Sequence, residues 1–182
     1  MIPLAGGVVL HSIWADLPQH PAKRYRLRRE DPQALFVHHS GADNGRNGVN
    51  AFVPMARWHI NHHGWAGIGY HYGITQRPSF DHLNNLVVFG LQPPWLVSNH
   101  TGGVNRTSCG VVVQGNYNVD EPADHVEECL EALIPWWMEV HERNAAEDLG
   151  WHSIADDWGG RRKLACPGAA LEDWLEDYVL AS

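Results

Sequence analysis

Leu35-Phe36-Val37-His38-His39 is a short apolar run that ends in two adjacent histidines. Its length and its large or β-branched side chains predict a buried strand. Successive side chains of a strand point to opposite faces of the sheet, so only one of the two imidazoles can readily join any single site. The segment 41–48 that follows is rich in Gly, Asp and Asn and predicts a polar loop at the end of this strand.

Helical and strand-like segments alternate along the rest of the chain. Helices are expected at 50–63, 124–144 and 169–180, the first of them capped by Asn50 and ended by Gly64. Strands are expected at 70–75, 86–89 and 110–114, and loops at 92–107 and 150–167. Strands separated by helices predict an α/β fold, in which a single domain has a central mixed β-sheet flanked by about three helices.

The N-terminal region differs in composition from the rest. Residues 1–33 are rich in Pro and Arg and contain one strand-like run, at Val8–Ile13. We expect them to form an N-terminal extension packed on a main domain that spans residues 34–182. The apolar segment 2–10 is broken by Pro and Gly and lacks a basic region before it, so no signal peptide is expected. No run of about 18 apolar residues exists, so no membrane span is expected either.

Charge and aromatic content restrict the possible partners. The 182-residue chain has a formal net charge of −8 with its histidines neutral. Phosphate binding needs a basic surface, so this charge argues against a nucleic-acid partner. The chain also contains nine Trp, of which most are expected in the core. Trp residues in excess often line grooves that bind sugars or peptides.

The cysteines are three in number, which does not suggest a disulfide framework. Cys109 and Cys129 lie in apolar patterns and are expected to be small buried side chains. Cys166 differs because Pro167-Gly168 follows it and His152 precedes it by fourteen positions. This spacing does not fit a zinc-finger knuckle, but it fits two loop ligands that meet a third ligand from a strand end.

Two imidazoles and one thiolate can hold a zinc ion and leave its fourth position open for water. An open position is typical of a catalytic zinc site, so the chain is expected to hydrolyse its substrate. Thirteen His also offer accidental combinations. His59 and His63 share a helix face at a spacing that can bind zinc, but no Glu follows His59 as in the zincins, and a solvated or core role is expected.

Several segments together resemble the zinc-dependent N-acetylmuramoyl-L-alanine amidases, a family that includes peptidoglycan recognition proteins and small bacteriophage lysozyme-type amidases. The resemblance is carried by 36–40, 57–59, 64–72, His152 and Cys166-Pro167-Gly168. Between them, 99–105 and 110–115 look like the family's groove segment and central strand. The match covers about residues 34–175 with every segment in the family's order, which makes chance agreement improbable.

The resemblance implies one Zn²⁺ per chain, with His38, His152 and Cys166 as its ligands. The domain 34–182 would then be a zinc amidase catalytic domain. Tyr70 matches the tyrosine that lies beside the zinc-bound water, where it would hydrogen-bond the water or the developing oxyanion. These roles agree with the chemistry of the residues, because zinc activates water and polarises the scissile carbonyl.

One position departs from the family pattern. The family usually carries a Thr or Lys two positions before the ligand Cys, and here that position is Leu164, which cannot donate a hydrogen bond. Lys163 is expected to take over this catalytic role, with Arg161 and Arg162 as alternatives. The segment 153–163 is also longer than usual in the family and is expected to reshape the pocket.

Three residues are expected to bind substrate. His100 and Asn105 match family positions in the groove segment. Trp95 lies in the long loop 92–107, where an aromatic side chain is suited to contact a sugar or a peptide. For each there is a structural alternative, since Asn is a common turn former and Trp a common core residue.

The implied activity is cleavage of the amide bond between N-acetylmuramic acid and L-alanine of the stem peptide of bacterial peptidoglycan. The expected setting is a bacteriolytic phage or prophage endolysin, made in the cytoplasm without a signal peptide and brought to the cell wall by a holin. A recycling amidase that acts on cytoplasmic muropeptides is an alternative, although such enzymes commonly use Asp where this chain has Cys166. A recognition module that binds muropeptide without cutting it is the other alternative, and non-catalytic members typically lack the ligand Cys.

Overall fold

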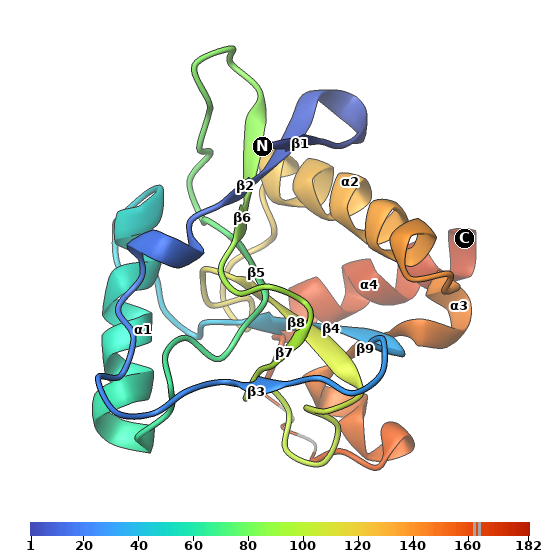
Figure 1. The fold of residues 1–182 in the computed structure, drawn as a ribbon. Helices are drawn as coiled ribbons and strands as arrows, with labels where there is room; N and C mark the ends of the chain where they lie inside the picture. The colour runs from blue at the N-terminus through green and yellow to red at the C-terminus, as the bar shows by residue number, and fades with distance from the viewer. Residues whose placement is uncertain (162, 164) are drawn as a thin grey trace.

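A mixed sheet of seven strands runs through the computed structural model, which describes residues 1–161, 163 and 165–182 (Figure 1). Its strands, in spatial order, are β1 (Ile2–Pro3), β2 (Val8–Ser12), β6 (Leu86–Gly90), β5 (Tyr72–Ile74), β8 (Ser108–Val113), β4 (Ala34–His39) and β9 (Leu149–Trp151). The pairs β1–β2 and β5–β6 are antiparallel, and the other neighbours are parallel. A separate small sheet pairs β3 (Arg26–Leu27) with β7 (Leu96–Val97).

Helices cover both faces of this sheet, as the α/β prediction requires. The helix α1 (Val49–His63) lies on one face, and α2 (Asp124–Val140) and α4 (Ala169–Ala181) lie on the other (Figure 1). A short helix, α3 (Ala145–Asp148), leads from α2 to β9. Among the described residues no helix combines the length and the apolar content needed to cross a bilayer.

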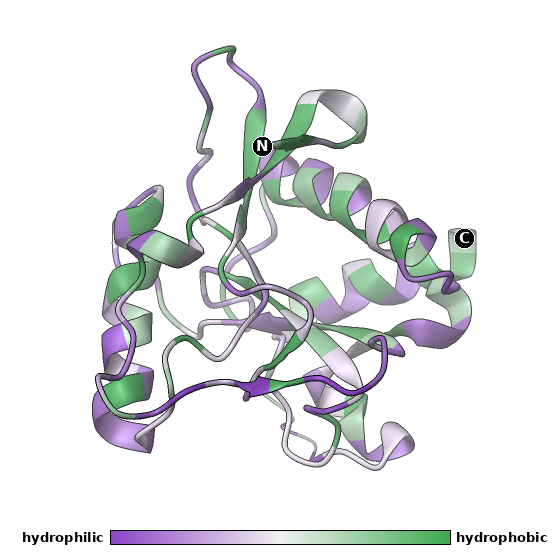
Figure 2. Cartoon of the chain, in the orientation of Figure 1, coloured by the Kyte–Doolittle hydropathy of each residue, from purple (hydrophilic) through white to green (hydrophobic). Residues whose placement is uncertain are grey.

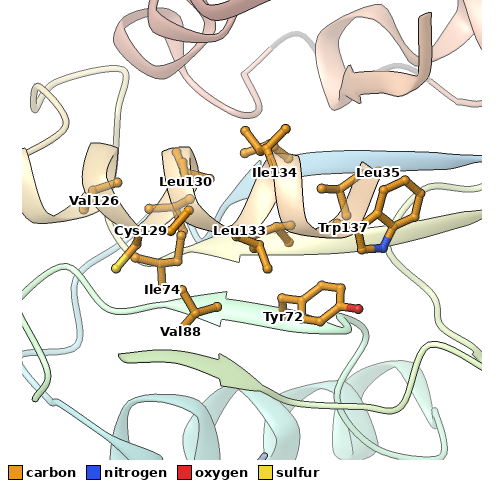
Figure 3. Packing of buried hydrophobic residues seen from close by; sticks show 14 of the residues in the cluster. Leu35, Tyr72, Ile74, Val88, Val126, Cys129, Leu130, Leu133, Ile134 and Trp137 are labelled. Carbon is orange, nitrogen blue, oxygen red and sulfur yellow. The ribbon is translucent and has the colours of Figure 1, made fainter. Parts of the chain in front are cut away.

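The core is built mainly around β4 and β8, whose residues are all buried. Parallel strands covered on both faces are typically continuous apolar runs, which explains why these two were the clearest strands in the sequence. On one face, α2 supplies a stripe of apolar residues, and bands of high and low hydropathy alternate along it in Figure 2. Figure 3 shows side chains of α2, among them Leu133 and Trp137, packed over Tyr72 of β5.

The helix α1 begins one residue before the prediction and lacks the predicted cap. Its N-cap residue is Gly48, with φ 59° and ψ −147°, and no side chain caps this end. Asn50 is instead the second residue of the helix. The predicted end is confirmed, since Gly64 adopts the left-handed conformation (φ 60°, ψ 33°) that closes helices.

The helix α2 is shorter than predicted. It ends at Val140 rather than 144, and Glu142 has a positive φ of 54° in the turn that follows. Asn144 accepts a hydrogen bond from the backbone N–H of Ala146 (2.9 Å) and so caps the next helix, α3. An Asn side chain competes well for such a capping position, which is why it begins an element here instead of ending one.

The segment 150–167 was predicted to be a loop, but part of it forms regular secondary structure. The strand β9 reaches Trp151, and a 3-10 helix, η3, spans His152–Trp158. A three-residue strand with Gly150 at its centre carries almost no local strand signal. It forms because β4 offers a parallel edge with which Leu149, Gly150 and Trp151 are paired.

Residues 1–33, predicted as an extension packed on the main domain, contribute strands to both sheets. The strand β2 pairs in parallel with all five residues of β6, and β3 pairs with β7 in the long loop. The segment is therefore integrated into the central sheet. The division into an extension at 1–33 and a catalytic domain at 34–182 remains a proposal.

Candidate metal centre

His38, His152 and Cys166 meet at the carboxyl ends of β4 and β9. One ligand atom from each lies within 4.8 Å of the others. The register explains how two of them meet, because Val37 is paired with Trp151 and the next residues along the parallel strands are His38 and His152. Residues at the same level of neighbouring strands point to the same face, so both imidazoles enter one site.

The spacing of these donors fits a zinc ion. Zinc lies about 2.0–2.1 Å from imidazole nitrogen and about 2.3 Å from thiolate sulfur, which at tetrahedral angles puts the two donors about 3.6 Å apart. The distance from Nδ1 of His38 to Sγ of Cys166 is 3.6 Å. The rings of His38 and His152 meet edge to face, with their centroids 4.8 Å apart. Two nitrogens and one sulfur in this arrangement leave a fourth coordination position open.

The imidazole of His38 is held in its neutral form. It is fully buried, and burial lowers its pKa well below the usual value, with smaller contributions in the same direction from His100, His152 and Lys163. A neutral imidazole is the form that binds a metal. Burial also lowers the pKa of His152, while a hydrogen bond to the backbone of Arg161 acts in the opposite direction.

A chain of hydrogen bonds selects the nitrogen of His38 that faces the site. Nε2 of His38 lies 3.1 Å from Nδ1 of His100 and 3.2 Å from Oγ1 of Thr101. Nε2 of His100 lies 3.3 Å from the carbonyl oxygen of Ser108, to which it can only donate. We therefore assign Nδ1 of His100 as the acceptor and Nε2 of His38 as the donor. This leaves the lone pair on Nδ1 of His38 directed toward Cys166.

Cys166 comes from the segment that crosses back over His152. The backbone N–H of Lys163 donates to the carbonyl of His152 (2.9 Å), and that of Cys166 donates to the carbonyl of Lys163 (3.0 Å). The thiol is 3 % exposed, and burial raises its pKa to about 11, although a hydrogen bond from the His39 backbone and the charge of Lys163 act in the opposite direction. A metal ion must therefore displace the thiol proton when it binds.

His39 points to the opposite face, as expected for neighbours on a strand. Its Nδ1 accepts a hydrogen bond from the backbone N–H of Tyr117 (3.3 Å), and its ring also hydrogen-bonds the backbone of Ala165. His39 is thus not part of the three-residue group. It contacts the backbone immediately before Cys166.

Tyr70 lies beside the metal position, just before β5 begins. Its ring centroid is 5.3 Å from that of His38, and on another side it contacts the ring of His59. Burial, and to a smaller degree Cys166, raises the pKa of its hydroxyl. The hydroxyl therefore keeps its proton near neutral pH and is a hydrogen-bond donor.

The exposed Lys163 lies at the rim of the group. Its charge lowers the pKa of His38, His39, His152 and Cys166. Of the alternatives, Arg161 lies along the loop at Gly102, to whose carbonyl its backbone N–H donates (2.6 Å). Arg162 and Leu164 lie outside the described residues.

The three predicted substrate residues lie in different places. His100 is buried and has both ring nitrogens engaged inside the protein, so its contact is with His38. Asn105 accepts a hydrogen bond from the backbone N–H of Thr101 (2.8 Å) and lines a cavity of about 390 Å³ together with Trp65. Trp95 is 62 % exposed and lines a different hollow, formed with residues 28–32 and His141.

Two residues of the site were not singled out from the sequence. Thr101 and Ser108 complete the chain of hydrogen bonds behind His38. Both are common loop and strand residues, and only their distances to the imidazoles reveal the role. A local sequence signal for either is lacking, since Thr101 is 63 positions from His38 along the chain.

Comparison with known proteins identifies the family of the chain. Residues 28–169 match the family model described as N-acetylmuramoyl-L-alanine amidase. The chain belongs to this amidase family. Within it, the amidase-type α/β fold that the sequence predicted is confirmed. A search of curated protein sequences finds no match.

Solved structures with the same fold include bacterial, phage and insect proteins. The endolysin N-acetylmuramoyl-L-alanine amidase LysCS from Clostridium intestinale is 20 % identical, with a TM-score of 0.68 over 94 % of this chain and 95 % of that one. The Ph2119 endolysin of a Thermus scotoductus bacteriophage is 16 % identical, with a TM-score of 0.68 over 93 % and 97 %. Drosophila PGRP-LB is 21 % identical, with a TM-score of 0.69 over 90 % of each chain. At these identities the likeness is one of fold.

Proposed function

We propose that this amidase-family protein is a zinc-dependent peptidoglycan hydrolase of the endolysin type. Its reaction would be cleavage of the amide bond between N-acetylmuramic acid and L-alanine of the stem peptide. The observation that carries the proposal is the convergence of His38, His152 and Cys166, whose ligand atoms lie within 4.8 Å of one another although the residues are far apart in sequence. Two imidazoles and a thiolate form a donor set suited to zinc.

The side chains around this group have properties that suit amide hydrolysis. His38, His152 and Cys166 would hold the zinc ion, which would supply Lewis-acid chemistry to the amide carbonyl and to water. The protonated hydroxyl of Tyr70 donates a hydrogen bond to the oxygen on which negative charge develops. The ammonium group of Lys163 acts as the second donor, in place of the Thr or Lys that the family usually has at the position of Leu164.

For substrate binding we propose the cavity that Asn105 and Trp65 line. Its lining includes Asn99 and Gly103, which belong to the same loop as His100 and Thr101, the residues behind His38. Trp95, with its exposed ring, offers a separate contact for sugar or peptide further along the same loop. His100, by its burial, is assigned to the support of His38 instead.

The assignment to the endolysin type is supported by similarity of fold. LysCS and the Ph2119 protein are both described as endolysins, and the chain covers almost all of each. We propose on this basis that the protein acts on the bacterial cell wall. PGRP-LB in a complex with tracheal cytotoxin shows that the same fold can also hold a muropeptide ligand in another protein.

Mass spectrometry of digested peptidoglycan tests the proposal most directly, because it identifies the bond that is cut. Purified cell walls are incubated with the zinc-loaded protein, and new L-alanine amino termini and stem-free glycan are expected. Products cut at a glycosidic bond or within the stem peptide would contradict the proposed specificity. Zinc at one per chain without any new amino terminus would favour a recognition module that binds muropeptide without cutting it.

A further inference from the structure

The carboxylate of Glu172 binds both neighbours of His152. Its Oε1 accepts a hydrogen bond from Nε1 of Trp151 (3.1 Å) and another from Oγ of Ser153 (2.6 Å). Trp151 and Ser153 are buried, at 6 % and 4 % exposure. One oxygen atom thus fixes the two residues that flank a proposed metal ligand.

These bonds act on the opposite side of the sheet from the metal centre. Trp151 belongs to the apolar cluster beneath α2 and α4, and it is level with Val37, which faces the same cluster. His152 is the next residue and turns the other way, to the face of His38. The hydrogen bonds from Trp151 and Ser153 to Glu172 of α4 hold the backbone on both sides of His152. This backbone sets the direction in which the imidazole of His152 leaves the sheet.

The same helix begins three residues after Cys166, the second proposed ligand from this part of the chain. Glu172 lies in the first turn of α4, and its backbone N–H donates to the carbonyl of Gly168 (2.9 Å). Gly168 is only two positions beyond Cys166 and is packed so closely against the backbone of Tyr117 and Asn118 that a side chain there would clash. The start of α4 is thus held firmly, and Glu172 links it to the end of β9.

We propose that Glu172 is a positioning residue for the metal centre, which holds His152 in register with Cys166. Its hydrogen bonds reach the residues on both sides of His152 and none of the three proposed ligands. Its charge also raises the pKa of Cys166, an effect that Glu172→Ala and Glu172→Gln remove alike. The inference rests on the proposed function, because it assumes that the three ligands bind zinc. Removal of a group that hydrogen-bonds a metal ligand typically weakens metal affinity by about 10–100-fold, and Glu172, which bonds the neighbours of a ligand, is expected to give the lower end of that range.

The test compares Glu172→Ala with Glu172→Gln and with Glu176→Ala, which removes an exposed carboxylate one turn further along the same helix. Zinc affinity is measured by competition with a chromophoric chelator, and the Co²⁺-substituted proteins are compared by absorption spectroscopy. Glu172→Ala is expected to weaken zinc binding about tenfold or more and to shift the Co²⁺ bands. Glu172→Gln keeps an oxygen acceptor for both donors and is expected to have the Co²⁺ spectrum of the wild type. The control Glu176→Ala is expected to have the same spectrum.

The spectrum separates positioning from a general loss of stability. A variant that is only less stable lowers the amplitude of the Co²⁺ bands but leaves their positions unchanged. Unshifted bands or undiminished zinc affinity in Glu172→Ala would overturn the inference, and so would a Glu172→Gln variant that behaves like Glu172→Ala. If Glu172→Ala does not fold, Ser153→Ala removes one of the two donors and must give a smaller shift in the same direction.

The result is distinguishable from failure of the proposed function. A wild-type protein that binds no zinc would overturn the proposed function and this inference with it. A wild-type protein that binds zinc, together with a Glu172→Ala variant that binds it equally well, would overturn the inference alone.

Discussion

The strand that carries His38 and the segment 152–166, which carries His152 and Cys166, hold these proposed metal ligands by different means. His38 is fully buried in β4, which pairs with β8 on one side and β9 on the other, and its ring is fixed by His100 and Thr101. The late segment leaves the sheet after Trp151 and returns through exposed residues such as Lys163. A few backbone hydrogen bonds hold it in place. His38 therefore lies within the sheet, whereas His152 directly follows its edge strand and Cys166 lies outside it, so these two proposed ligands depend more on local contacts.

This difference indicates where the site should tolerate the loss of a side-chain contact. A residue within a sheet keeps its backbone position when one side-chain neighbour is lost, because its strand stays paired with the neighbouring strands. A ligand held by a few contacts depends on each of them. We expect the metal centre to respond most strongly to loss of a ligand itself, then to changes around it in proportion to how directly they act.

The largest loss of zinc binding and activity is expected from removal of any one of the three proposed ligands, whether on the strand or on the later segment. His38→Ala, His152→Ala and Cys166→Ser should each abolish zinc binding and turnover, since two remaining donors cannot hold the ion in the same geometry. Metal content and release of amino termini from purified walls are measured after washing with chelator. His62→Ala, at an exposed histidine of α1, is the control and should retain both. Full activity in any ligand variant would remove that residue from the site.

The next effect is expected at Tyr70, on the strand side. Tyr70→Phe removes a protonated donor beside His38 and should lower turnover about 10²–10³-fold, as for other donors to a developing oxyanion. Zinc content should not change, because the hydroxyl is not one of the three ligands. Steady-state kinetics and metal analysis of the same sample check both statements. Turnover equal to the wild type would exclude Tyr70 from the mechanism.

A smaller effect is expected from the support behind His38. His100→Phe keeps a ring of similar size but removes the nitrogen that lies 3.1 Å from Nε2 of His38. Loss of such a partner typically weakens metal binding about 10–100-fold. Competition with a chelator measures it, with Thr101→Ser, which keeps its hydroxyl, as the control. An unchanged dissociation constant would show that the strand alone holds the imidazole.

The pH dependence of zinc binding separates the two kinds of ligand. Burial raises the pKa of Cys166 to about 11, whereas the pKa values of His38 and His152 are lowered. Between pH 7 and 9 the histidines are therefore already neutral and only the thiol must lose a proton, so zinc affinity should rise about tenfold per pH unit. Calorimetry in buffers of different ionisation heat should find one proton released per zinc from the ligands. Binding without proton release would mean that the thiolate is already formed.

The smallest effect is expected at Lys163, on the exposed segment. Its ammonium group is solvated, and interactions of exposed charges are weak. Lys163→Ala should lower turnover by about tenfold or less, and Lys163→Arg should restore most of it. Kinetics at two salt concentrations check this, since screening should reduce the difference between wild type and Lys163→Ala. A loss of turnover as large as that of Tyr70→Phe would contradict this prediction and would show that Lys163 contributes as much to catalysis as Tyr70 does.

Sequence patterns predicted the central elements well and the edges poorly. The strands around 35–39 and 110–114 are buried on both faces, so their apolar runs are continuous and easily recognised. The strand β9 was missed because three residues around Gly150 carry little strand propensity and depend on β4 for pairing. The end of α2 was misplaced for a similar reason, since Asn144 found a capping partner in the next helix.

The proposed metal ligands could be named from the sequence, whereas the residues that support them could not. His38, His152 and Cys166 are residue types with distinctive chemistry in a recognisable order. Thr101, Ser108 and Glu172 are ordinary residues in ordinary places. Their roles depend on which atoms come within about 3 Å after folding, and no local pattern encodes such distances.

The sequence by itself determined which reactive side chains this protein has: two imidazoles, one thiol and a phenol in the order of an amidase domain, with apolar runs that place the first imidazole at the end of a buried strand. Only the tertiary structure decided that His38 and His152 lie side by side, because the parallel register of β4 and β9 puts residues more than a hundred positions apart at the same level. It also decided which nitrogen of His38 faces the site. That choice belongs to a chain of hydrogen bonds that exists only when the loop 99–107 is packed against the sheet.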